Sequence, residues 1–114
     1  MFKVYHNPRC KKSRAGLQYL KDKGFEPEIV EYLKNPLTVN ELKDILVKLD
    51  KKPEEILRKQ EAVYKSDFKG KNFSDDEWMQ ILTEHPKLLQ RPIVVKDYKA
   101  VIGDPPENID TLIK

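Results

Sequence analysis

The sequence is poor in the residues from which several kinds of functional site are built. Its 114 residues include one cysteine, two histidines and four glycines. A single cysteine cannot form an internal disulfide, which excludes a disulfide-stapled secreted domain. Because His6 and His85 lie far apart and only one cysteine is present, no metal-ligand spacing occurs and we expect no metal site. The four glycines form no loop that could cradle a phosphate.

Long apolar runs are also missing. No stretch approaches the roughly 20 residues needed to cross a bilayer, and the N-terminal segment lacks the apolar core of a signal peptide. We therefore expect a cytoplasmic protein with no membrane partner. The net charge of +3, from 22 basic and 19 acidic residues, is too small to predict nucleic-acid binding. The length fits one domain over 1–114.

The single cysteine has unusual surroundings. Cys10 follows a short apolar run, precedes a predicted helix, and has basic neighbours, while no acidic residue occurs before Asp22. The N-terminal end of a helix stabilises an anion, and nearby cations lower the pKa of a thiol. A lone cysteine is more often an inert, buried small side chain. The residues alone leave a reactive thiol and an inert one about equally supported.

The hydrophobic pattern predicts an α/β protein. Short β-branched or aromatic runs predict strands at 2–5, 28–32, 93–95 and 100–102. A helix is expected at about 11–23, ended by Gly24, and a short helix closes the chain through Ile109 and Leu112. A strand, helix and strand in this order favour a parallel pair, because the crossover returns the chain in the same direction.

The segment at about 34–90 is predicted to be a helical insertion between the second and third strands. Two capping boxes, Thr38 with Glu41 and Ser74 with Glu77, mark the starts of helices. Pro53 is placed to begin a short helix. The polar stretch 65–72 is expected to be a loop.

With the cysteine after the first strand, this element order is that of a thioredoxin-like fold. Four blocks also resemble the arsenate reductase (ArsC) family of the glutaredoxin-linked type, in the family's order. They are 5–14 (YHNPRCKKSR), 32–38 (YLKNPLT), 56–59 (ILRK) and 85–95 (HPKLLQRPIVV). The resemblance covers nearly the whole chain and implies a thiol-dependent oxidoreductase.

The resemblance implies a role for each residue around the thiol. Cys10 corresponds to the nucleophile that attacks arsenate, His6 to a residue that tunes its ionisation, and Ser13 to a hydrogen-bond donor to the sulfur. No cofactor is expected to be bound. Glutathione is the implied co-substrate and glutaredoxin the implied partner, since the chain has no resolving cysteine of its own.

Arginines are the implied oxyanion ligands, because guanidinium groups bind oxyanions with two parallel donors. Arg58 and Arg91 match two of the family's three oxyanion-binding arginines, and Arg14, which lies close to Cys10 in sequence, is also expected to bind substrate. Pro92 matches the cis-proline position of thioredoxin-like folds.

One position departs from the family pattern. Asp104 stands where the third arginine is expected, and Lys96 or Lys99 is a candidate substitute for that cation. Two other functions therefore stay open: a reductase acting on glutathione adducts rather than arsenate, and an Spx-like regulator that binds RNA polymerase. Ser13 removes the second cysteine of a C-x-x-C pair, so an internal disulfide switch is impossible under the regulatory alternative. A fold retained without catalysis is a third possibility.

Overall fold

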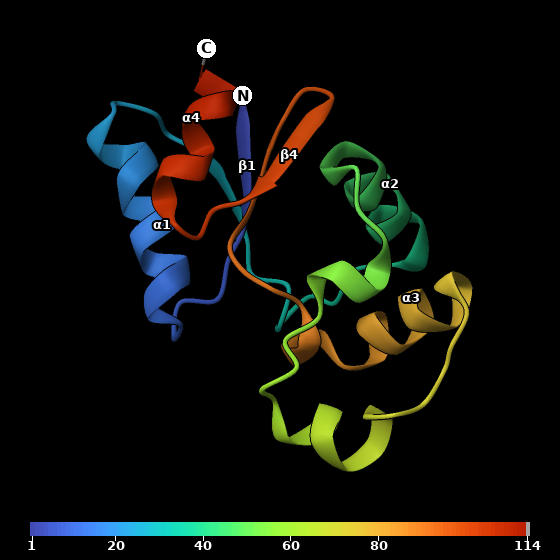
Figure 1. The fold of residues 1–114 in the computed structure, drawn as a ribbon. Coiled ribbons are helices and arrows are strands. Elements are labelled where there is room, and N and C mark those ends of the chain that lie inside the picture. Colours follow the sequence, from blue (N-terminus) through green and yellow to red (C-terminus); the bar gives the residue numbers. More distant parts are fainter. Residues whose placement is uncertain (114) are drawn as a thin grey trace. The chain divides into compact units, whose positions relative to one another are not determined.

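The computed structural model describes residues 1–113, and the chain divides into two compact units (Figure 1). Unit 1 comprises Met1–Asn35 and Arg91–Lys114, and unit 2 comprises Pro36–Gln90. Unit 2 thus covers nearly the same residues as the segment expected to be a helical insertion. That the two units form one domain stays a prediction.

Unit 1 is built on a mixed sheet of four strands in the order β2-β1-β3-β4. The strands are β1 (Phe2–Tyr5), β2 (Glu28–Val30), β3 (Ile93–Lys96) and β4 (Lys99–Ile102). β1 pairs in parallel with β2 and antiparallel with β3, which forms an antiparallel hairpin with β4. This arrangement confirms the predicted α/β class and the predicted strands.

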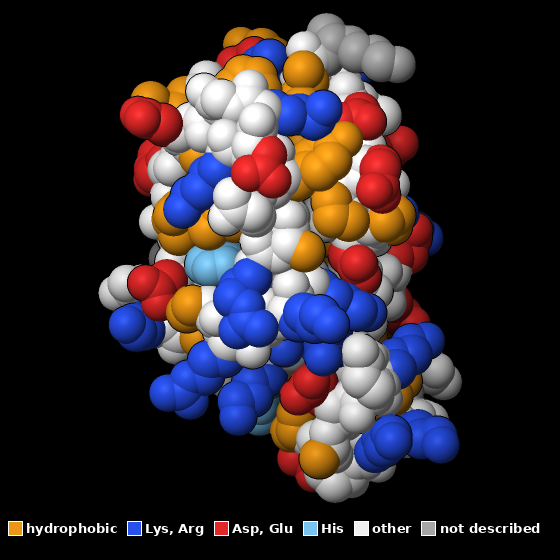
Figure 2. All heavy atoms as spheres, turned by 90° about the vertical axis from the view of Figure 1, so that its left-hand side faces the viewer, with side chains coloured by type: hydrophobic (Ala, Val, Ile, Leu, Met, Phe, Trp, Pro, Cys, Tyr) orange, Lys and Arg blue, Asp and Glu red, His pale blue; other side chains and the backbone are white. Residues whose placement is uncertain are grey.

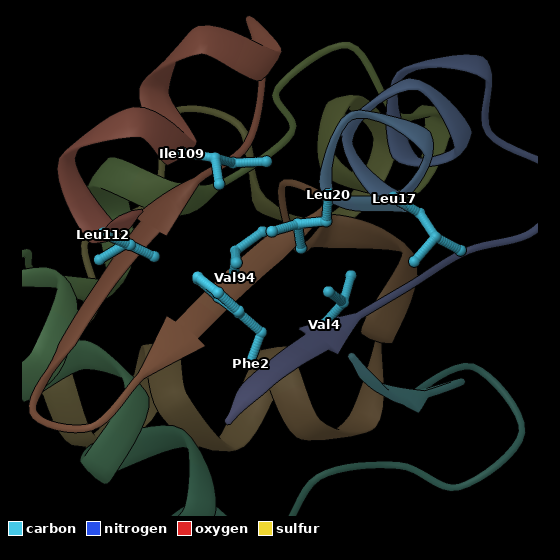
Figure 3. Close-up of a cluster of buried hydrophobic side chains, with 7 residues drawn as sticks. All are labelled: Phe2, Val4, Leu17, Leu20, Val94, Ile109 and Leu112. Carbon is cyan, nitrogen blue, oxygen red and sulfur yellow. The ribbon is translucent and has the colours of Figure 1, made fainter. Parts of the chain in front are cut away.

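Helix α1 (Lys11–Asp22) and helix α4 (Asp110–Ile113) cover one face of this sheet together with the 3₁₀ turn η4 (Pro106–Ile109) (Figures 1 and 3). Apolar side chains from the two central strands and these helices meet in one cluster. Its buried members are Phe2, Val4, Leu17, Leu20, Val94, Ile109 and Leu112. Burial of this apolar area holds α1, and therefore its N-terminal end, against the sheet.

Unit 2 is helical. Its main helices, α2 (Val39–Leu49) and α3 (Asp75–Glu84), pack on each other, and both begin with the predicted capping boxes. The 3₁₀ turn η1 (Pro53–Ile56) starts at the proline that the sequence marks. A second 3₁₀ turn, η3 (Pro86–Leu88), follows α3. No helix within residues 1–113 is long and apolar enough to cross a membrane.

Three elements differ from the expectation. β2 ends at Val30 rather than at residue 32, because the chain turns there and the backbone N–H of Lys34 bonds to the carbonyl of Glu31. The C-terminal helix is divided into η4 and α4. The expected loop at 65–72 overlaps a π-helical turn, η2 (Tyr64–Phe68), whose Phe68 ring contacts three other rings: Phe73, Trp78 and His85.

Candidate active site

The register of the strands brings three segments of unit 1 to the same end of the sheet. Tyr5 at the end of β1 pairs with Ile93 at the start of β3, and Ile93 pairs with Ile102 at the end of β4. The chain after β1, the chain before β3 and the chain after β4 therefore meet there. These segments carry Cys10, Arg91 and Asp104, respectively.

A short hydrogen-bonded loop places Cys10 at the start of α1. The backbone N–H of His6 bonds to the Val30 carbonyl at 2.9 Å, which ties the loop to β2. The side-chain oxygen of Asn7 accepts from the Arg9 N–H at 3.0 Å, and the Asn7 carbonyl accepts from the Cys10 N–H at 3.0 Å. Cys10 then accepts the first helical bond, from the Arg14 N–H. It is thus the N-cap residue of α1.

The thiol of Cys10 is partly buried, and its pKa is lowered. Burial alone raises the pKa. A hydrogen bond from the Arg91 side chain, the backbone N–H groups of Ser13 and Lys12, and the positive charge of Arg91 together outweigh that effect. The Cys10 side chain makes no capping hydrogen bond in α1, but the nearby N–H groups stabilise negative charge on the sulfur. The geometry therefore favours the thiolate, which is the nucleophilic form.

The chain around Cys10 is basic and exposed. The side chains of Arg9, Lys11, Lys12 and Arg14 all belong to exposed residues. The first turn of α1 has no acidic residue, whereas α2 and α3 both carry acids there. Lys and Arg side chains gather on the face that carries α1 (Figure 2). This surface favours the approach of an anion.

Ser13 and His6 form a buried hydrogen-bonded pair behind the thiol. The hydroxyl of Ser13 lies 2.7 Å from Nδ1 of His6 and accepts from the backbone N–H of Asn7 at 2.9 Å. Because the Ser13 oxygen already accepts the bond from Asn7, its hydroxyl proton is free to be donated to the neutral imidazole of His6. Ser13 was expected to donate a side-chain hydrogen bond to the sulfur. In the structure its backbone N–H faces the sulfur, and its hydroxyl serves His6.

The environment of His6 favours the neutral ring. Burial is the main cause that lowers its pKa, and Lys21 and Arg14 lower it further, while Glu31 raises it. A neutral imidazole can accept the Ser13 proton at Nδ1, which agrees with the hydrogen bond described above. His6 therefore contributes to the shape of the loop that presents Cys10.

Arg91 reaches the sulfur from the chain before β3. Its neighbour Pro92 is buried, and the peptide bond between them is cis, the isomer that the family resemblance implies. Pro92 packs against two glycines: a Cβ added to Gly16 of α1 would lie 2.6 Å from Pro92 Cγ, and one added to Gly103 would lie 3.1 Å away. These close approaches hold α1 next to the segment that carries Arg91.

The other predicted arginines have different surroundings. Arg14 donates to the carbonyl of Pro8 at 3.1 Å, within the loop that presents Cys10. Arg58 belongs to unit 2, where Nη2 is 3.2 Å from Oε2 of Glu61 and the backbone N–H bonds to Leu88. The role of Arg58 in oxyanion binding stays a prediction.

Neither lysine considered as a substitute cation lies near Asp104. Lys96 and Lys99 pair with each other beside the turn of the β3–β4 hairpin, at the opposite end of the strands from Pro92 and Asp104. Asp104 itself is ion-paired with Lys12, Nζ to Oδ2 at 3.3 Å.

One contributor to the site was missed by sequence reasoning. Asn7 is buried and makes the two bonds that shape the turn before Cys10. The Asn-Pro pair at 7–8 was the available signal, since such pairs favour turns closed by the Asn side chain. Within residues 1–113, no group of three or more His, Cys, Asp or Glu side chains could hold a metal ion.

Fold and site define a thioredoxin-like α/β protein with a thiol of lowered pKa at the start of its first helix. Residues 5–112 match the ArsC family, and the chain belongs to that family. It is 40% identical over 113 residues to an arsenate reductase of Neisseria meningitidis serogroup A, covering 97% of each chain. Over 108 residues it is 40% identical to an arsenate reductase of Haemophilus influenzae, covering 93% of each.

A solved structure is similar throughout. The arsenate reductase from Vibrio cholerae superposes with a TM-score of 0.91 at 37% identity, covering 96% of this chain and 95% of that one. The alignment thus includes both units.

Proposed function

We propose that this protein is a thiol-dependent arsenate reductase that uses Cys10 as its nucleophile. The observation that carries the proposal is the environment of the sulfur, where Arg91 and two helix N–H groups lower the pKa of the thiol. A site that stabilises a thiolate also stabilises an oxyanion bound beside it. The arsenate reductases to which the chain is similar support this substrate class.

The proposed reaction begins with attack of the Cys10 thiolate on the arsenic of arsenate. A sulfur–arsenic bond forms, and one arsenate oxygen leaves as water after protonation. Reduction of As(V) to As(III) needs two electrons. A glutathione thiolate attacks the Cys10 sulfur, the sulfur–arsenic bond breaks with its electron pair left on arsenic, arsenite leaves, and Cys10 becomes a mixed disulfide with glutathione. A second glutathione thiol reduces that mixed disulfide, so that the two glutathiones end as their disulfide. Since Cys10 is the chain's one cysteine, these thiols come from outside, and glutaredoxin is the proposed partner in returning Cys10 to its free form.

Each nearby residue has a proposed part in this sequence. Arg91 donates hydrogen bonds to the thiolate and to the bound oxyanion. Arg14 adds positive charge at the start of α1, and Arg58 is proposed as a further oxyanion ligand. His6 and Ser13 position the loop so that the Lys12 and Ser13 N–H groups face the sulfur.

A coupled assay tests the proposal. Purified protein is incubated with glutathione, glutaredoxin, glutathione reductase and NADPH, and NADPH oxidation is followed with and without arsenate. We expect arsenate-dependent turnover that is abolished in Cys10→Ser. Turnover with a glutathione mixed disulfide but none with arsenate would contradict the proposal and assign the thiol to adduct reduction instead.

A further inference from the structure

An ion pair joins the first turn of α1, which begins just after Cys10, to the chain that follows β4. Lys12 is in the first turn of α1, and Asp104 follows β4. Their side chains meet at 3.3 Å and are partly exposed. The backbone N–H of Lys12 is one of the groups that lower the pKa of Cys10, so the residue that carries the ion pair also contacts the sulfur through its backbone.

Asp104 is held in this position by its backbone neighbours. The N–H of Gly103 donates to the Pro92 carbonyl at 2.8 Å. The side-chain amide of Asn108 donates to the Asp104 carbonyl at 3.3 Å and to the Ile102 carbonyl at 3.1 Å. These bonds position the backbone of Asp104 on the segment that packs on Pro92, the residue after Arg91.

The pair changes the charge that an approaching substrate meets. Four basic residues surround Cys10 in sequence: Arg9, Lys11, Lys12 and Arg14. Within residues 1–113, the ion pair that joins one of them to an acid is that of Lys12 with Asp104. The carboxylate offsets the charge of this lysine in the first turn of α1. A doubly charged anion loses more attraction by this cancellation than a singly charged or neutral electrophile does.

We propose that Asp104 is a specificity-determining residue that sets the charge selectivity of the Cys10 thiol. By neutralising Lys12, it lowers the preference of the site for highly charged anions relative to less charged electrophiles. The inference rests on the proposed function in that both concern the same thiol. Its test, however, does not require arsenate reduction.

The test compares two alkylating agents of similar size. Iodoacetate is an anion and iodoacetamide is neutral, and both react with the thiolate. The ratio of their second-order rate constants therefore reports the electrostatic potential at the sulfur, because any change in the pKa of Cys10 affects both rates equally. The ratio is measured at neutral pH and low ionic strength, where screening is weak.

We expect Asp104→Asn to raise the ratio of iodoacetate to iodoacetamide rates by roughly two- to fivefold, as removal of one nearby charge implies. Asp104→Ser serves as a second variant with the same expectation. Asp97→Asn is the matched control, because Asp97 lies in the turn at the other end of the hairpin with a φ of 55° that asparagine also adopts. Its ratio should equal that of the parent protein.

The double variant Lys12→Met/Asp104→Asn removes both charges of the pair and leaves its net charge at zero. Its ratio of iodoacetate to iodoacetamide rates should therefore return close to that of the parent. An unchanged ratio in both Asp104 variants, or an equal rise in Asp97→Asn, would overturn the inference.

The arsenate assay then separates this inference from the proposed function. If both hold, Asp104→Asn lowers the KM for arsenate by a similar factor while the control does not. A shifted alkylation ratio without arsenate turnover in any protein would leave the inference standing and reject the proposed function. Arsenate turnover with an unchanged alkylation ratio in the Asp104 variants would support the proposed function and reject the inference.

Discussion

The sulfur of Cys10 is subject to opposing effects, and their balance decides its reactivity. Burial disfavours the charged thiolate, whereas Arg91 and the N–H groups of Ser13 and Lys12 favour it. Arg91 acts both through a hydrogen bond and through its charge. It is therefore the side chain whose removal should change the thiol most.

Arg91→Ala should slow the alkylation of Cys10 by iodoacetamide at neutral pH by roughly three- to tenfold, because less of the thiol is ionised when its pKa rises. The measurement is the alkylation rate as a function of pH, which also gives the direction of the pKa change. Arg9→Ala is the matched control, since it removes an exposed guanidinium that is absent from the contacts of the sulfur. Equal effects in the two variants would show that general charge, and not the Arg91 contact, activates the thiol.

His6 predicts a pH dependence of stability. Because its pKa in the folded protein lies below the ordinary value of 6.5, the neutral ring stabilises the fold fully above that value, and this contribution is lost as the pH falls through the folded-state pKa. Urea unfolding of the parent should therefore show a falling free energy of unfolding below about pH 6.5. The fall should be shallower in His6→Gln, which has no titrating ring, and identical slopes in the two proteins would contradict this account of His6.

At the scale of elements, α1 is held in place by a close approach as well as by its apolar face. Gly16 is buried, and the ring of Pro92 occupies the space that a side chain at this position would need. Intrinsic helix propensity favours alanine over glycine by about 1 kcal/mol. Overpacking opposes this gain in helix propensity. An added Cβ would lie 2.6 Å from the buried ring of Pro92, so the clash can be removed only by a shift of α1 or of the segment that carries Arg91.

Gly16→Ala should therefore destabilise the protein by about 1–3 kcal/mol, measured by denaturant unfolding. It should also slow alkylation of Cys10, since the two segments of the site move apart. Ala15→Gly, at the exposed neighbouring position, is the control and should cost only about 0.5–1 kcal/mol through propensity, with unchanged alkylation. A stabilised Gly16→Ala variant would show that the approach to Pro92 is not tight.

Local signals in the sequence were sufficient for most elements. The capping boxes at Thr38 and Ser74 predicted the starts of α2 and α3, because their bonds form within four residues. η2 could not be predicted, since a single π turn has no periodicity and depends on where the Phe68 ring packs. The early end of β2 comes from the backbone turn that begins at Glu31, which the apolar run through Tyr32 obscured.

At the scale of the whole molecule, the site of unit 1 is assembled from chain segments on both sides of the inserted unit 2. Sequence reasoning could identify Cys10 and Arg91 through the family blocks. It could not find the Lys12–Asp104 pair, because that contact depends on the register of β1, β3 and β4. For the same reason it left Lys96 and Lys99 as candidates, although the hairpin carries them to the other end of the sheet.

The most direct measurement of the central claim is the arsenite formed from arsenate, separated and quantified by ion chromatography. The reaction contains glutathione and glutaredoxin, with the parent protein, Cys10→Ser or no protein. The account predicts arsenite in proportion to the parent protein and only the background level with Cys10→Ser. Arsenite at background with the parent, while its Cys10 alkylates rapidly, would contradict the claim that this activated thiol reduces arsenate.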